Sequence, residues 1–133
     1  MTNEGEVYFA LYGGDFDPGV VSRLVGIEPT STRHKGEPRP KHSSWKVSSG
    51  KVENDIIDIY EMSSTLVSRL QPYAEKIATV KQHMKLEAVL AVVLRITTDD
   101  SISTPAIGFE SEVISFLNAV GASIDIDTYR NVP

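Results

Sequence analysis

The chain has 133 residues and a formal net charge of −5, and its length corresponds to one domain. Hydrophobic residues make up 41% and charged residues 23%, proportions that exclude disorder of the whole chain. The longest nearly apolar run, 88–94, is far shorter than the ~20 residues that span a bilayer. The chain contains no cysteine for a disulfide or a thiol nucleophile. We therefore expect one soluble domain over 1–133, without membrane association.

The charge is unevenly distributed. Residues 30–51, the basic segment, hold six basic side chains against one acidic residue, Glu37, so this segment carries +5 and the rest of the chain −10. An acidic whole disfavours binding to nucleic acid or to an anionic membrane surface. Residues 1–6 are polar and acidic, a pattern unlike a signal peptide, so we expect a cytoplasmic protein.

The first third of the chain predicts a strand, a helix and short extended pieces. Residues 7–12 alternate two sets of apolar and aromatic side chains and stop at two glycines, which predicts a strand. A helix is expected from Asp17, a good N-cap, and Pro18 to Gly26, a residue type that ends helices. Three segments follow, namely an extended edge piece at 27–32, a loop at 35–43 and a short strand at 44–48.

The centre of the chain predicts a long helix over 54–84, because apolar residues recur there at steps of three and four. Pro72 should break or kink it into two segments. Residues 55–60 also fit a strand, so the start of the first segment stays open.

The last third predicts strand, loop, helix and strand. Residues 87–97 are apolar on both faces, which indicates a central strand with a neighbour packed on each face, or an interface. A polar loop at 98–105, a helix at 110–120 that ends at Gly121, and an alternating strand at 123–129 complete the chain.

Both ends of the chain follow the order strand, acidic turn, short helix ending Val-Gly, and extended segment. Two explanations of this similarity stay open: an internal β-α-β duplication around the kinked central helix, or chance. The simplest architecture is an α+β sandwich, in which helices pack on a mostly antiparallel sheet of four or five strands.

Six stretches carry a family resemblance: 8–11, 15–18, 24–30 with Gly-Ile-x-Pro-Thr, 35–40 with Lys-Gly-x-Pro, 44–48 around Trp45, and 121–129. Together they resemble the bacterial family called domain of unknown function 4279, over nearly the whole chain. The resemblance implies no activity, cofactor or catalytic residue. It implies that Lys35, Gly36 and Trp45 matter for structure or for binding.

Two groups of residues are candidate binding sites. The basic segment offers Arg33, Lys35, Arg39 and Lys41 for phosphate or carboxylate and Trp45 for stacking, unless these lysines and arginines form a solvated loop over a core tryptophan. Asp125 and Asp127 share one face of the last strand, where two carboxylates could act as general acid and base. They could also be the polar face of an exposed strand, or form a salt bridge to residues 33–46.

Acidic pairs also follow two predicted strands, at Asp15 with Asp17 and at Asp99 with Asp100. Four carboxylates could hold Mg²⁺ or Ca²⁺ if the loops met, but helix capping and solvated turns account for them more simply. No zinc-binding histidine spacing, serine-nucleophile, P-loop or dinucleotide motif occurs. We expect no metal site, no cofactor and no catalytic residue.

The sequence favours a non-catalytic protein-interaction module that binds a protein partner or a second copy of itself. Bacterial immunity proteins, which are often small acidic domains, offer an analogy. Two alternatives stay open. One is a small-ligand binder or hydrolase-type enzyme that uses Asp125 and Asp127 near the basic segment, and the other is weak nucleic-acid binding through 33–46.

Overall fold

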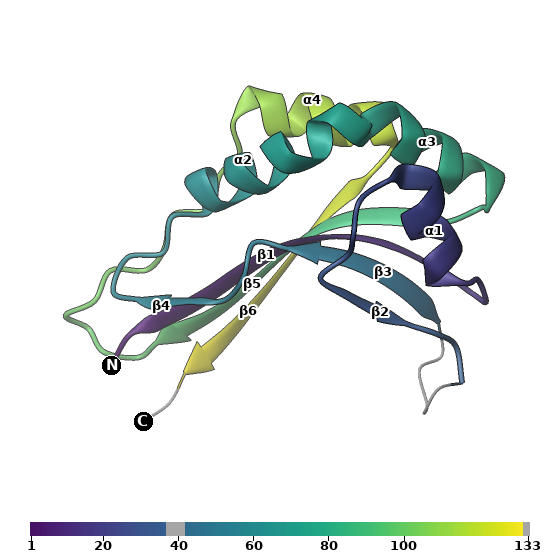
Figure 1. Cartoon of the computed structure of the whole chain (residues 1–133). Coiled ribbons are helices and arrows are strands. Elements are labelled where there is room, and N and C mark those ends of the chain that lie inside the picture. Colours follow the sequence, from purple (N-terminus) through teal and green to yellow (C-terminus); the bar gives the residue numbers. More distant parts are fainter. Residues whose placement is uncertain (37–41, 132–133) are drawn as a thin grey trace.

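The computed structural model describes residues 1–36 and 42–131 and arranges them as one open sheet with all four α-helices on the same side (Figure 1). In chain order the elements are β1 (Asn3–Gly13), α1 (Pro18–Val25), β2 (Ser31–Arg33), β3 (Ser43–Ser48), β4 (Val52–Asn54), α2 (Ile59–Leu70), the 3₁₀ turn η1 (Gln71–Tyr73), α3 (Ala74–His83), β5 (Glu87–Thr97), α4 (Ser111–Val120) and β6 (Ser123–Asn131). The α+β class predicted from the sequence is confirmed.

The six strands form a mixed sheet in the order β2-β3-β1-β5-β6, and β4 pairs with the start of β1 at Asn3–Gly5. Every pair is antiparallel except β5 with β6, which run parallel. The predicted count of four or five strands is too low. β2 and β4 have only three residues each, too few for alternation to mark them as strands in the sequence.

The central helix begins later than predicted. Residues 52–54 belong to β4, and α2 starts only at Ile59, where the Asp58 carboxylate accepts a hydrogen bond from the Glu61 N–H. Such an N-cap satisfies one of the free N–H groups of the first turn. The predicted interruption at Pro72 is confirmed, because η1 separates α2 from α3 there.

Both predicted glycine stops are confirmed. α1 ends at Gly26, with a φ of 89°, and α4 ends at Gly121, with a φ of 70°. At these angles a side chain would be strained, so glycine suits both positions. At the other end of α1, the Asp17 carboxylate accepts a hydrogen bond from the Gly19 N–H, as an N-cap does.

The core lies between the helices and one face of the sheet. Val7, Phe9 and Leu11 of β1 and Leu90, Val92 and Leu94 of β5 are fully buried on that face. Phe9 packs edge to face against Phe116 of α4, with ring centroids 5.6 Å apart, a favourable aromatic geometry.

Strand β5 is central, as predicted, because β1 pairs with one of its edges and β6 with the other. Of the two alternatives for its apolar faces, a layer packed on each face is not found among the described residues, and the other alternative, an interface, stays a prediction. Val89 and Val93 point away from the helices and are partly exposed. On this face of β5, small and β-branched residues line a surface. The apolar pattern of the β5 sequence alone does not distinguish such a surface from a second buried face.

The two ends of the chain are only partly alike. In β1-α1-β2 and in β5-α4-β6, the second strand runs parallel to the first. β3 lies between β1 and β2, however, whereas β5 and β6 are direct neighbours. Across the described ranges, none of the helices has the length and apolar character needed to cross a membrane.

Candidate functional site

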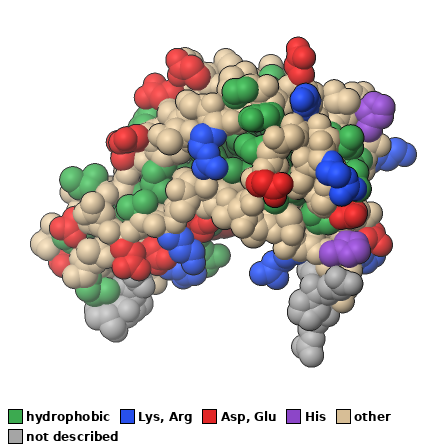
Figure 2. Space-filling model, viewed as in Figure 1, with side chains coloured by type: hydrophobic (Ala, Val, Ile, Leu, Met, Phe, Trp, Pro, Cys, Tyr) green, Lys and Arg blue, Asp and Glu red, His purple; other side chains and the backbone are tan. Residues whose placement is uncertain are grey.

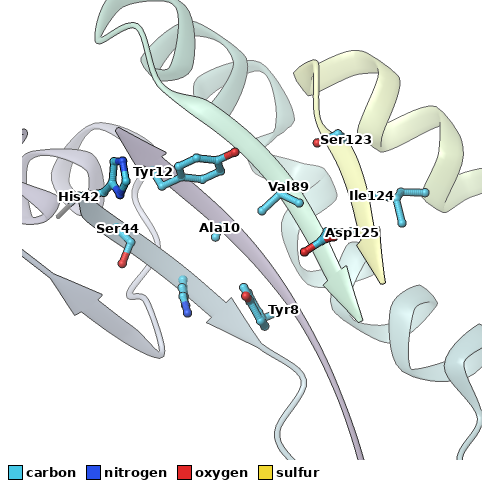
Figure 3. A pocket seen from close by; sticks show the side chains of 10 residues that line it. Tyr8, Ala10, Tyr12, His42, Ser44, Val89, Ser123, Ile124 and Asp125 are labelled. Carbon is cyan, nitrogen blue, oxygen red and sulfur yellow. The ribbon is translucent and has the colours of Figure 1, made fainter. Parts of the chain in front are cut away.

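The sheet face that the helices leave uncovered, here called the open face, contains a hollow of about 570 Å³. Figure 2 shows the molecule hollowed on this side, and Figure 3 shows the side chains around the hollow. They come from four strands and the residue before β3: Tyr8, Ala10, Tyr12, His42, Ser44, Lys46, Val89, Ser123, Ile124 and Asp125.

Strand register explains why these residues meet. Ala10 of β1 pairs with Lys46 of β3 on one side and with Val89 of β5 on the other. Residues directly opposite one another place their side chains on the same face of a sheet. Ala10 is therefore a small floor residue between longer side chains, and this difference in size leaves the hollow.

Tyr8 is the most electrostatically constrained group on the open face. The Lys46 ammonium lies 4.4 Å from the centroid of its ring, within the range of a cation–π interaction. Burial raises the pKa of the Tyr8 phenol, and the negative charges of Asp127, Asp125 and Glu6 raise it further. The raised pKa favours the protonated phenol, which offers a hydrogen-bond donor on the open face.

Further polar contacts extend the open face along β1. The Ser48 hydroxyl donates to a Glu6 carboxylate oxygen at 2.6 Å. The Arg95 guanidinium lies 3.9 Å from a Glu4 carboxylate oxygen and 4.9 Å from the centroid of the Tyr129 ring. The open face thus combines tyrosines, hydroxyls and charges of both signs.

The structure brings part of the predicted site together. Asp125 and Asp127 lie on the open face, as the register of β6 with β5 requires, and Asp125 lines the hollow with Lys46. Arg33 is exposed and pairs with Ser44, another lining residue. The Lys35 backbone N–H donates to the Ser43 hydroxyl, and Arg39 and Lys41 lie outside the described residues.

A salt bridge from Asp125 or Asp127 to residues 33–46, one of the alternatives for these carboxylates, is absent from the parts of the chain that the structure describes, which leave out 37–41. Instead the negative charges of both carboxylates contribute to the raised pKa of the Tyr8 phenol, while the Lys46 ammonium lies over the ring of the same residue.

The interpretation of Trp45 as an exposed stacking residue is wrong. Its side chain is fully buried on the helix side of β3, and its indole N–H donates to the Ser22 hydroxyl of α1 at 3.0 Å. The alternation of β3 buries Ser43, Trp45 and Val47 together. Trp45 therefore anchors α1 to the sheet.

The four turn carboxylates do not meet. β1 and β5 are antiparallel, so Asp15 and Asp17, which follow β1, lie at the opposite end of the sheet from Asp99 and Asp100, which follow β5. Asp17 caps α1, and Asp99 accepts hydrogen bonds from the Ser101 N–H and hydroxyl, which lower its pKa. Within the described ranges, no three His, Cys, Asp or Glu side chains form a metal-binding group.

Sequence reasoning missed Tyr8, Tyr12 and Ser44 as site residues. The alternation over 7–12 separates the two tyrosines from the buried residues and so carries a signal for an exposed aromatic face. The signal identifies a site only once the strand order is known, because β3 and β6 supply the other lining residues.

Comparison with known proteins gives one match. The sequence profile of the family described as domain of unknown function (DUF4279) matches residues 3–131. The chain belongs to this family. The match covers every strand and helix of the DUF4279 fold seen here, and the family description names no activity. Searches of curated proteins and of solved structures give no significant match.

Proposed function

We propose that this DUF4279 protein is a non-catalytic protein-binding module whose open face is the contact surface. The observation that carries the proposal is the one-sided helix layer, which leaves the faces of β3, β1, β5 and β6 uncovered over a hollow of about 570 Å³. A sheet with one face free of helices is available to a partner of matching shape.

The side chains of the open face support a protein partner. Tyr8, Tyr12 and Tyr129 present rings with polar tips, and tyrosine is enriched at protein interfaces because it contributes large contact area at low entropic cost. Asp125, Asp127 and Glu6 beside them disfavour nucleic acid, whose phosphates they would repel.

A second candidate, a small-molecule site, is favoured by one observation. The hollow has a volume within the range of about 300–1,000 Å³ that is usual for ligand pockets. The protonated Tyr8 phenol, the Lys46 ammonium and the Asp125 carboxylate would then fix the orientation of a polar ligand.

Site-specific crosslinking tests the protein-binding proposal. Because the chain contains no cysteine, an introduced cysteine is its single labelling site. Ser44→Cys places a single thiol at the hollow, and Gln82→Cys places one on exposed α3 as a matched control. Each purified variant is labelled with a thiol-directed photocrosslinker, added to a cell extract and illuminated. We expect a discrete protein adduct from Ser44→Cys and none from Gln82→Cys.

Loss of side chains at the open face should then remove that adduct. Tyr8→Ala combined with Tyr12→Ala on the Ser44→Cys background is expected to abolish it while the circular dichroism spectrum stays native. Equal adducts from both thiols, or an adduct that survives this change, would contradict the proposal. A thermal shift with a small-molecule library and no protein adduct would favour the second candidate.

A further inference from the structure

β6 is the outermost strand on its side of the sheet, and this position leaves one of its edges free. β5 pairs with its inner edge over residues 123–131, and along the described chain no strand pairs with its outer edge. An edge strand presents backbone N–H and C=O groups that can pair with another chain. Its nine residues are long enough to accept such a strand.

The side chains of β6 add a chemical pattern to this free backbone. Asp125 and Asp127 lie on the open face, and neither has an ion-pair partner within the described ranges. By the register of β6 with β5, Ile124 and Ile126 lie on the helix side, although Ile124 also borders the hollow at the sheet edge, and they are 41% and 42% exposed. Along this edge strand, carboxylates on one face therefore alternate with exposed isoleucines on the other face.

Three of the registers in which two copies of β6 could pair oppose like charges. Two β6 strands related by a two-fold axis pair antiparallel, so a register centred on Asp125 or on Asp127 places that carboxylate opposite its own copy. A register centred on Ile126 places Asp125 opposite Asp127. Like charges directly opposite one another destabilise a strand pair. A basic partner strand avoids this repulsion in every register, so the two carboxylates favour a strand of opposite charge.

We propose that the outer edge of β6 binds an extended segment of a partner protein in which basic residues alternate with apolar ones. The basic side chains pair with Asp125 and Asp127, the apolar ones cover Ile124 and Ile126, and backbone hydrogen bonds hold the added strand. The inference goes beyond the proposed function, because it uses the backbone edge of β6, although Ile124 and Asp125 also border the hollow.

A synthetic peptide tests the inference with the full-length chain. The probe is the capped, fluorescently labelled peptide Thr-Lys-Val-Lys-Val-Lys-Thr, and its controls carry Glu in place of Lys or N-methyl groups on alternate backbone nitrogens. In fluorescence anisotropy we expect the Lys peptide to bind at least about tenfold more tightly than either control. Hydrogen exchange of β6 amides should slow when the peptide binds.

Charge reversal on the protein gives the matched test. Asp125→Lys with Asp127→Lys is expected to reverse the preference, so that the Glu peptide binds more tightly than the Lys peptide. Because both residues lie at a sheet edge, we expect the melting temperature to stay close to that of the wild type. Equal binding of the N-methylated peptide, or absence of Lys-peptide binding, would overturn the inference.

Two further variants separate this edge from the open-face site. Ile126→Lys adds a positive charge on the helix side of β6, so it should weaken the Lys peptide and leave the Ser44→Cys adduct intact. Tyr12→Ala should weaken the adduct and leave peptide binding unchanged. Loss of peptide binding in Tyr12→Ala but not in Ile126→Lys would place the peptide in the hollow and refute edge pairing.

Discussion

Asn3 shows how one buried polar side chain joins distant parts of the chain. It has no exposed surface, and its amide nitrogen donates to the backbone carbonyls of Asp55 and Ser103. Its amide oxygen accepts from the Thr97 N–H at 2.9 Å. The first residue of β1 thus fixes the end of β5 and two loops at once.

Replacing this residue should be costly. Asn3→Ala leaves two carbonyls and one N–H without their partner, so we expect the free energy of unfolding to fall by about 2–4 kcal/mol. Denaturant unfolding measures the change. The control is Asn54→Ala, since the Asn54 side chain is exposed and, among the described residues, accepts a hydrogen bond only from the neighbouring Asp55 N–H. A loss no larger than in this control would show that the three hydrogen bonds add nothing.

Tyr8 should make stability depend on alkaline pH. Its pKa is raised in the folded chain above the unfolded value of about 10, so the folded state holds the phenol proton more tightly. This contribution is complete below the unfolded pKa and is lost as pH rises through it towards the folded pKa. We expect unfolding free energy to fall more steeply above about pH 9 in the wild type than in Tyr8→Phe.

The charges around the phenol supply a control for that experiment. Asp127→Asn keeps Tyr8 and removes one of the negative charges that raise its pKa. Above about pH 9, the unfolding free energy of Asp127→Asn should fall with pH more steeply than that of Tyr8→Phe and less steeply than that of the wild type. Identical pH profiles for all three proteins would mean that the folded environment leaves the phenol unperturbed.

At the scale of elements, β5 contributes four side chains to the core, namely Ala88, Leu90, Val92 and Leu94. Leu94 is fully buried under the helices, so Leu94→Ala is expected to cost about 2–4 kcal/mol. Val89→Ala on the open face of the same strand should cost less than about 1.5 kcal/mol, because Val89 is already partly exposed. Fast amide exchange along β5 would contradict its central position.

Elements were predictable where local chemistry defines them. The Asp17 cap with Pro18, the glycine stops and the full span 87–97 follow from neighbouring residues, and the structure has them. β4 was not predictable, because its three residues become a strand only by pairing with Asn3–Gly5, about fifty positions away in the sequence. Propensity carries no information about such a partner.

At the scale of the molecule, the candidate site was predictable in part. Asp125 and Asp127 were identified from alternation within one strand, and they lie on the open face. The hollow itself depends on strand order, which sets β1 between β3 and β5 and so places Lys46 beside Ala10 and Tyr8. Which face the helices would cover is likewise a property of the whole fold, and this decided the burial of Trp45.

The basic segment makes a further prediction for the molecule as a whole. Its +5 lies against −10 elsewhere, so an acidic partner should be steered to it, and association should slow as salt shortens the Debye length from ~10 Å at 0.1 M to ~3 Å at 1 M. Arg39→Glu with Lys41→Glu should slow association and leave the melting temperature unchanged, as measured by stopped-flow mixing and calorimetry.

The matched control changes the same amount of charge elsewhere. Lys76→Glu with Lys81→Glu on α3 alters the net charge equally, and it should affect association less than the change in the basic segment. A lowered melting temperature with an unchanged association rate for Arg39→Glu and Lys41→Glu would instead make these residues structural.

The central position of β1 has a consequence during synthesis. β1 leaves the ribosome first, yet its partner β5 ends at Thr97, and the Asn3 side chain bonds to a carbonyl 100 residues away. At about 5–20 residues per second, β1 waits roughly 4–17 s for that partner. β3 and β4 can pair with one edge meanwhile, but the other edge stays open beside Val7, Phe9 and Leu11. Nascent chains of this protein should therefore depend on chaperones until residue 97 has emerged.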